Sequence, residues 1–243
     1  MTSIATGWNM VSRLEEAFLR YLPPVVGSLG LVSLWAVFYW VPTDAGLGLS
    51  QRIFYYHVPS ATTSFAAFAG AGVASAMYLR TSSSDWDHAA YSSVVTGMIF
   101  ATIVLCTGSI WARTAWGAWW TWDARLTTFL ILWLVFATYV LLRTLARGND
   151  LAPRYAAVLA IVGALNIPLV MMATRLWRTI HPQVIRNPEG GIQDPAMRAT
   201  LGICMLTIPL LFCWLWALRV RLLRLETRAE EMFEDSYREE GRR

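Results

Sequence analysis

The sequence contains no lysine, although it has 243 residues and 20 basic side chains, all of them arginine. Charged residues make up only 15% of the chain, whereas hydrophobic residues make up 56%. The mean hydropathy is +0.44, which is too high for an ordinary soluble domain of this length. The composition therefore excludes a soluble or disordered protein and indicates an integral membrane protein.

Motifs for covalent cofactor attachment and for nucleotide binding are also missing. The three cysteines form no C-x-x-C or C-x-x-C-H pattern, so the chain is not itself a c-type cytochrome. They lie within apolar runs, where a thiol serves as a small hydrophobic group. The sequence has no Walker loop, glycine-rich phosphate motif or hydrolase elbow. Any step driven by ATP would need a partner protein.

The apolar runs themselves lack acidic residues and histidines. Without acids at membrane depth, the chain has no visible carriers for a proton relay or an ion pathway. Without histidines there, it does not resemble electron carriers that hold haem between their membrane-spanning helices. The chemistry of this protein is therefore expected outside the hydrocarbon core.

Six apolar runs have about the length of roughly 20 residues that crosses a bilayer as a helix. The first run has no small-residue cleavage site after it, so we interpret it as a retained span and not as a signal peptide. We predict an all-α integral membrane protein, a bundle of six transmembrane helices that forms one domain over residues 1–243, with a charged tail at 219–243. The predicted spans are residues 24–41, 60–79, 93–112, 126–142, 155–173 and 199–218.

Six spans would leave both termini on the same side of the membrane. Thirteen of the 20 arginines fall on that side, and the excess of basic residues in cytoplasmic segments predicts that both termini are cytoplasmic. The first, third and fifth loops would then face outward. These loops carry His57, the segment 116–125 and His181, respectively.

The segment WGAWWTWDAR, residues 116–125, holds four tryptophans within seven positions. Trp116, Trp119, Trp120 and Asp123 are spaced i, i+3, i+4 and i+7, which predicts one face of a short helix. Aromatic belts normally occur at both membrane surfaces, so a one-sided cluster favours a binding surface for a flat, apolar ligand. The alternative is an amphipathic helix in the headgroup region, with Asp123 as the N-cap of the next span.

His57 and His181 are the only histidines predicted to face outward, one in each loop that flanks the tryptophan cluster. A large, flat ligand that accepts an imidazole on either face is haem. The alternative is that each histidine simply makes a hydrogen bond at the membrane interface. Haem propionates would pair with guanidinium groups, and spacing does not choose among four outward arginines. These are Arg52, Arg113, Arg125 and Arg178.

Four stretches of sequence match a known family. They are RIFYYHVP around His57, TGSIWARTAWGAWWTWDARLT, LWRTIHP with His181, and DPAMR before the last span. With these motifs the chain resembles the haem exporter protein C family of cytochrome c maturation, within the tryptophan-rich superfamily of haem-handling proteins. The resemblance covers nearly the whole length.

The resemblance implies that His57 and His181 are the axial ligands of a non-covalent haem b. It also implies a platform for the ring that serves as a docking surface for a haem chaperone, formed by Trp116, Gly117, Trp119, Trp120, Trp122 and Asp123. The expected role is haem delivery and not catalysis. The protein would hold haem at the outer, periplasmic face of the bacterial cytoplasmic (inner) membrane, and a membrane-anchored chaperone would carry it to apocytochrome c.

The same resemblance implies further partners, namely a small single-span subunit and the membrane and ATPase subunits of an ABC-type transporter. No nucleic acid is expected. Two other functions stay open at this point. The chain could be a haem channel or transporter subunit, with the small residues of its second span lining a path, or an oxidoreductase that passes electrons from quinol to haem iron.

Overall fold

The computed structural model describes residues 2–177, 180–181, 192, 194–240 and 242, and only the backbone for 2–15 and 240. This part of the chain is almost entirely helical and contains no β-strand, only a single bridge between Asp44 and Gly48. A π-helical segment (Ala36–Trp40) extends the first helix, and a 3-10 helix (Leu49–Ile53) leads into the second. The α-helices are α1 (Thr2–Trp35), α2 (Phe54–Thr81), α3 (Ser84–Trp116), α4 (Ala124–Leu145), α5 (Ala152–Leu176) and α6 (Pro195–Glu240).

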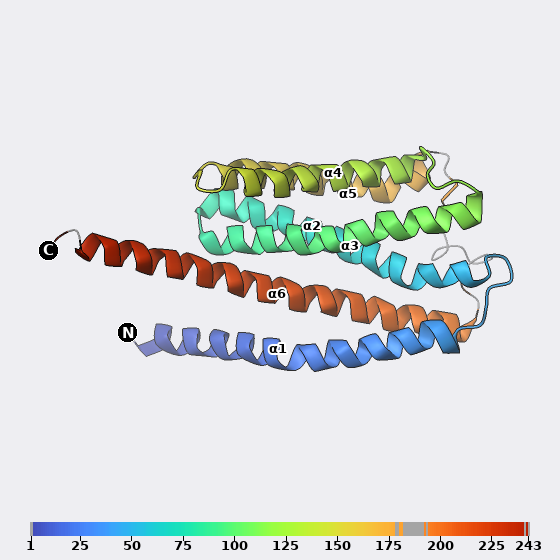
Figure 1. The fold of residues 1–243 in the computed structure, drawn as a ribbon, viewed down its shortest axis with the longest axis horizontal. Coiled ribbons are helices and arrows are strands. Elements are labelled where there is room, and N and C mark those ends of the chain that lie inside the picture. The colour runs from blue at the N-terminus through green and yellow to red at the C-terminus, as the bar shows by residue number, and fades with distance from the viewer. Residues whose placement is uncertain (1, 178–179, 182–191, 193, 241, 243) are drawn as a thin grey trace.

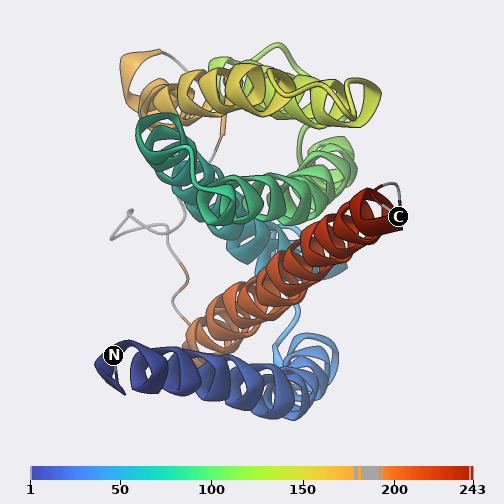
Figure 2. The same ribbon diagram turned by 90° about the vertical axis from the view of Figure 1, so that its left-hand side faces the viewer.

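The helices run roughly along one axis and stack in layers (Figure 1). Helices α4 and α5 form one outer layer, α2 and α3 lie beneath them, and α1 packs against α6 on the opposite side. The view along the bundle shows α1 apart from α2–α5, with α6 running between them (Figure 2). The main body is therefore the four-helix unit α2–α5, which α6 joins to α1.

Aromatic side chains fill the centre of the four-helix unit. The rings of Phe68 in α2 and Phe136 in α4 stack with their centroids 3.9 Å apart, and Val94 from α3 and Val170 from α5 belong to the same buried cluster. A second cluster, with Val37 and Tyr55, joins the end of the first helix to α2 and α6. Close packing of these side chains against one another holds the layers together.

Close approach between helices explains some of the small residues in α2 and α3. A Cβ atom at Gly72 would lie only 2.5 Å from the Cβ of Ala164 in α5. A Cβ at Gly97 in α3 would lie 2.8 Å from that of Ala67. Small residues let helices in membranes approach one another closely, so the small-residue face of α2 is a packing face.

Five of the helices are long and apolar enough to cross a membrane: Glu16–Trp40 and the elements α3, α4, α5 and α6. Helix α2 is not among these five, because its length includes many serine, threonine, alanine and glycine residues, several of them buried inside the bundle. An all-α protein with several membrane-spanning helices is thus confirmed. The count of six spans and the cytoplasmic termini stay predictions.

Two helices extend beyond the predicted spans. The first helix starts well before residue 24 and contains Pro23 and Pro24, and prolines are tolerated within spanning helices. The last helix continues without a break to Glu240, so residues 219–240 extend the final span as a solvent-exposed helix.

Both chain ends lie at the same end of the bundle (Figure 1). The ends of α1, α3 and α5 and the starts of α2, α4 and α6 all lie at the opposite end. His57 lies here in the first turn of α2 and not in the predicted loop, the tryptophan-rich segment joins α3 to α4, and His181 follows α5. The fold therefore brings together, at one end of the bundle, the three segments that the sequence singled out.

Candidate functional site

His57 lies in the first turn of α2, beside the last third of α3. Its Nδ1 atom is 3.0 Å from the hydroxyl oxygen of Thr107. A Cβ at Gly108 would lie 3.1 Å from the Cε1 of His57, so the imidazole lies directly against the backbone of α3. The side chain is only partly exposed, and its position is determined by a neighbouring helix.

The tryptophan-rich segment is not a helix, contrary to the prediction that Trp116, Trp119, Trp120 and Asp123 share one helical face. Helix α3 ends at Trp116, and Gly117 follows in the left-handed conformation with φ of 74°. Glycine adopts this conformation at helix ends without steric cost. The guanidinium of Arg113 also donates a hydrogen bond to the Gly117 carbonyl, which helps to end the helix there.

The four tryptophans consequently divide into two pairs by exposure. Trp116 and Trp120 are partly buried, whereas Trp119 and Trp122 are 60% and 78% exposed. Trp116 packs edge-on against Trp111, with the ring centroids 5.2 Å apart, and its ring centroid is 6.4 Å from that of His181. One pair is therefore partly sheltered by the protein, and the other is exposed.

Asp123 connects two of the three segments. Its Oδ1 accepts a hydrogen bond of 2.9 Å from the backbone N–H of Arg125, which makes it the N-cap of α4. Its Oδ2 accepts a hydrogen bond of 3.2 Å from the backbone N–H of Ile180. The N-cap role was one of the two alternatives from sequence. The second hydrogen bond gives Asp123 the further role of holding the residue before His181.

The pKa of His181 is affected by both His57 and Arg125. Burial first, and then the charges of Arg125 and His57, lower the pKa of His181 to about 3, although Asp123 acts in the opposite direction. Charges influence a pKa this way only when they lie close to the group. His181 therefore lies within electrostatic range of both groups, and it is neutral at physiological pH.

The four candidate arginines differ in their surroundings. Arg125 is partly buried, in the first turn of α4, and acts electrostatically on His181. Arg52 is partly buried, and its Nε has no hydrogen-bond partner within the part of the chain that the structure describes. Arg113 is exposed and bonded to Gly117. Arg178 lies outside the described residues.

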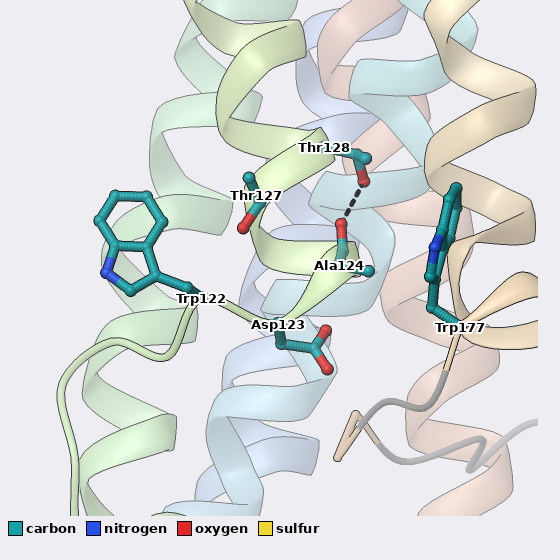
Figure 3. A pocket seen from close by; sticks show the side chains of 6 residues that line it. All are labelled: Trp122, Asp123, Ala124, Thr127, Thr128 and Trp177. Carbon is teal, nitrogen blue, oxygen red and sulfur yellow. Dashed lines mark hydrogen bonds between the residues drawn. The ribbon is translucent and has the colours of Figure 1, made fainter.

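An open pocket of about 510 Å³ lies beside these groups at the start of α4. Figure 3 shows Trp122 and Trp177 on its two sides, with the Asp123 carboxylate between them. The first turn of α4 contributes Ala124, Thr127 and Thr128. Trp177 and both threonines were not predicted from the sequence as site residues, although the threonines lie two and three residues after the tryptophan motif.

These side chains fit the needs of a haem group. An uncharged imidazole can donate a lone pair to iron, and a neighbouring guanidinium can pair with a propionate. The Nε1 of Trp120 is buried with no hydrogen-bond partner among the described residues, so it is available to a polar group of a ligand. The aromatic rings of Trp116 and Trp177 supply apolar walls.

Comparison with known proteins supports the same conclusion. The model of the family described as "Heme exporter protein C" matches residues 3–234. The chain belongs to this family. It is 34% identical to the heme exporter protein C of Escherichia coli strain K12 over 192 residues, which is 79% of this chain and 77% of the relative.

Two further relatives carry the same name. The protein from Bradyrhizobium diazoefficiens is 33% identical over 80% of this chain and 75% of its own length. The protein from Haemophilus influenzae is 28% identical over 93% of this chain and 90% of its own. The resemblance inferred from the sequence motifs is thereby confirmed.

Proposed function

We propose that this protein holds haem b non-covalently at the outer face of the bacterial cytoplasmic membrane and delivers it to a membrane-anchored haem chaperone for cytochrome c maturation. His57 and His181 would be the two axial ligands of the iron. Arg125 would pair with a propionate, and Arg52 is a second candidate for that role. The tryptophan-rich segment would hold the ring and contact the chaperone.

One observation carries this proposal: imidazoles from two distant segments lie within electrostatic range of one another and of a guanidinium, and a tryptophan ring packs against one of them. His181 feels the charges of both Arg125 and His57, and Trp116 packs against its ring. A membrane-interface helix, the alternative interpretation of the tryptophans, does not require any of these contacts. Family membership adds independent support.

The residues of the site have separable tasks. The imidazoles must be neutral to act as ligands, and the low pKa of His181 keeps it so. Haem supplies the iron that the imidazoles would ligate and the propionates that guanidinium groups would bind. Occupation of both axial positions by imidazole would keep dioxygen away from the metal. Such a site stores haem safely, and release is then the difficult step.

Delivery needs a surface that a second protein can reach while the ring is still held. Trp119 and Trp122 are the exposed members of the tryptophan-rich segment. Large exposed aromatic side chains mark protein contact surfaces. We assign these two tryptophans to docking of the chaperone, and Trp116 and Trp120 to contact with haem.

Release from two imidazole ligands would require a competing ligand or a change of conformation. We propose that a partner supplies this change, in an assembly with a small single-span subunit and the membrane and ATPase subunits of an ABC-type transporter. The test is the rate of haem transfer to the chaperone with wild-type and ATPase-inactive partner. Equal rates would rule out this driving role.

The first experiment is the absorption spectrum of the purified protein, oxidised and dithionite-reduced. Wild type should show low-spin, six-coordinate haem, and His57→Ala and His181→Ala should each lose that spectrum. His88→Ala is the matched control, because His88 is the third histidine and lies in the first turns of α3, at the other end of the helix. Loss of the spectrum in the control, or its retention in either of the other two variants, would contradict the assignment of ligands.

A further inference from the structure

Two hydrogen bonds of Thr107 in α3 together determine which ring nitrogen of His57 carries a proton. The hydroxyl of Thr107 lies 2.6 Å from the carbonyl oxygen of Ile103, one turn earlier in the same helix. The same hydroxyl oxygen lies 3.0 Å from the Nδ1 of His57. A hydroxyl group has a single proton to donate and can accept with its lone pairs.

The short contact with Ile103 determines where the hydroxyl proton lies. Two oxygen atoms 2.6 Å apart with no proton between them would repel one another, so the hydroxyl donates to the Ile103 carbonyl. The lone pairs of Thr107 then face His57, and the Nδ1 of that imidazole must be the donor. In a neutral imidazole only one nitrogen carries a proton, so the Nε2 of His57 presents a lone pair.

Gly108 fixes the plane of the same ring. The missing side chain leaves room for the imidazole, because a Cβ there would be 3.1 Å from Cε1 and 3.8 Å from Nδ1 of His57. A contact of 3.1 Å is closer than ordinary van der Waals distance, so an alanine would force the ring to move. Thr107 and Gly108, which are adjacent in one helix, therefore both constrain the position of the ring.

We propose that Thr107 is a positioning residue that fixes the tautomer and orientation of His57, so that Nε2 is the atom offered to iron. This inference rests on the proposed function, in which His57 is an axial ligand. Metal-ligating histidines commonly donate their second ring N–H to an oxygen atom, and that hydrogen bond raises the basicity of the ligating nitrogen. Thr107 takes the place of that outer partner.

The tautomer can be tested without haem. The chain has only three histidines, so the full-length protein labelled with ¹⁵N-histidine in lipid nanodiscs gives few ring resonances, and His57→Gln assigns those of His57. We expect a protonated Nδ1 and an unprotonated Nε2 for His57 in the wild type. A protonated Nε2 with an unprotonated Nδ1 would overturn the inference directly.

The variants Thr107→Val and Thr107→Ser separate the hydroxyl from the shape of the side chain. Valine has nearly the shape of threonine but no hydroxyl, and serine retains the hydroxyl. We expect Thr107→Val to mix the two tautomers and to weaken haem binding by about 10- to 100-fold, the usual effect of losing an outer partner. Thr107→Ser should keep both the wild-type tautomer and the wild-type haem affinity. Because it retains the hydroxyl, it also provides a test if the valine variant does not assemble.

Thr102 offers a matched control on the same helix. Its hydroxyl also donates to the carbonyl one turn back, Met98 at 2.8 Å, and accepts a ring N–H, that of Trp133 at 3.0 Å. Thr102→Val removes the same chemistry at a place without a histidine, and it should leave haem affinity unchanged. Equal losses in Thr102→Val and Thr107→Val would show a general packing effect and would overturn the inference.

Failure of this inference differs from failure of the proposed function. If His57→Ala loses six-coordinate haem while Thr107→Val keeps wild-type affinity and tautomer, the proposed ligand stands and the role of Thr107 is wrong. If His57→Ala binds haem as tightly as wild type and with the same spectrum, the proposed function loses its first ligand. The role assigned to Thr107 then falls with it.

Discussion

The backbone N–H of Ile180 donates a hydrogen bond of 3.2 Å to one carboxylate oxygen of Asp123, while the other oxygen caps helix α4 through Arg125. One side chain thereby holds the start of α4 and the residue that precedes His181. His57, by contrast, is held within a helix. The two proposed ligands are thus supported in different ways, and the Asp123 carboxylate takes part in the attachment of His181.

We predict that Asp123→Asn and Asp123→Ala differ in what they disturb. Asparagine can cap α4 with its carbonyl oxygen, but its amide NH₂ cannot accept the Ile180 N–H. Asp123→Asn should therefore keep the thermal stability of the protein and weaken haem binding, whereas Asp123→Ala should weaken haem binding and also cost about 0.5–2 kcal/mol of stability. Thermal unfolding and haem titration measure the two effects. Wild-type haem affinity in Asp123→Asn would disprove the role in holding His181.

Stability of the haem-free protein should depend on the protonation of His181. Its pKa lies at about 3 in the folded protein, below the ordinary value of 6.5. Between these two values the unfolded chain binds the proton and the folded chain does not, so stability falls as pH is lowered from about 6.5 towards 3. His181→Gln should flatten this part of the curve of unfolding midpoint against pH.

The comparison must use wild type and His181→Gln under the same conditions of detergent and salt. Their difference in unfolding midpoint should be constant above pH 6.5, the ordinary value, and should shrink or change sign below it. Parallel curves over the whole range would mean that His181 titrates normally in the folded protein. The site would then lack the burial described above.

Substitution of the partly buried tryptophans and substitution of the exposed tryptophans should impair different steps, haem binding and haem transfer respectively. Trp116→Ala removes a ring that packs against His181, so it should change the haem spectrum and the affinity. Trp119→Ala/Trp122→Ala removes two exposed rings, so haem binding should persist while transfer to the chaperone slows. Spectra of the purified variants, followed by transfer assays with the chaperone, separate the steps. Loss of haem from the outer double variant would refute this division.

The sequence predicted the helical class and the segments of the site because both depend on local signals. Apolar runs of spanning length identify helices directly, and two histidines on either side of a tryptophan cluster are visible in the chain. The apolar run at 24–41 predicted a span and not the full length of its helix, α1, which also contains Pro23 and Pro24.

The predicted helical conformation of the tryptophan-rich segment was wrong, and the sequence itself contains the reason. Periodic spacing predicted a helix through Trp116 and Asp123, but Gly117 ends α3 in the left-handed conformation. Glycine after an apolar helix is a common end signal, and it overrides spacing. The contacts of His57 with Thr107 and of Ile180 with Asp123 join residues 50 and 57 positions apart. No local pattern encodes such pairs.

Packing of α2 against α5 can be tested with two glycines on different faces of one helix. A Cβ at Gly72 would lie 2.5 Å from that of Ala164, whereas a Cβ at Gly70 meets no atom within 4 Å. Gly72→Ala should destabilise the protein by about 1–3 kcal/mol, because the two helices must separate. Gly70→Ala should be neutral or stabilise by roughly 0.5–1 kcal/mol, since alanine favours a helix.

The two variants also test whether α2 is held by the bundle or lines a path through it. If Gly72 faced a path for haem, an added methyl group would slow haem transfer and leave the unfolding temperature unchanged. Tight packing against Ala164 predicts the reverse, a lower unfolding temperature with the haem spectrum retained in the protein that remains folded. Thermal unfolding of Gly70→Ala and Gly72→Ala side by side, followed by spectra below the transition, distinguishes the two, and equal unfolding temperatures would contradict the packing of α2 described here.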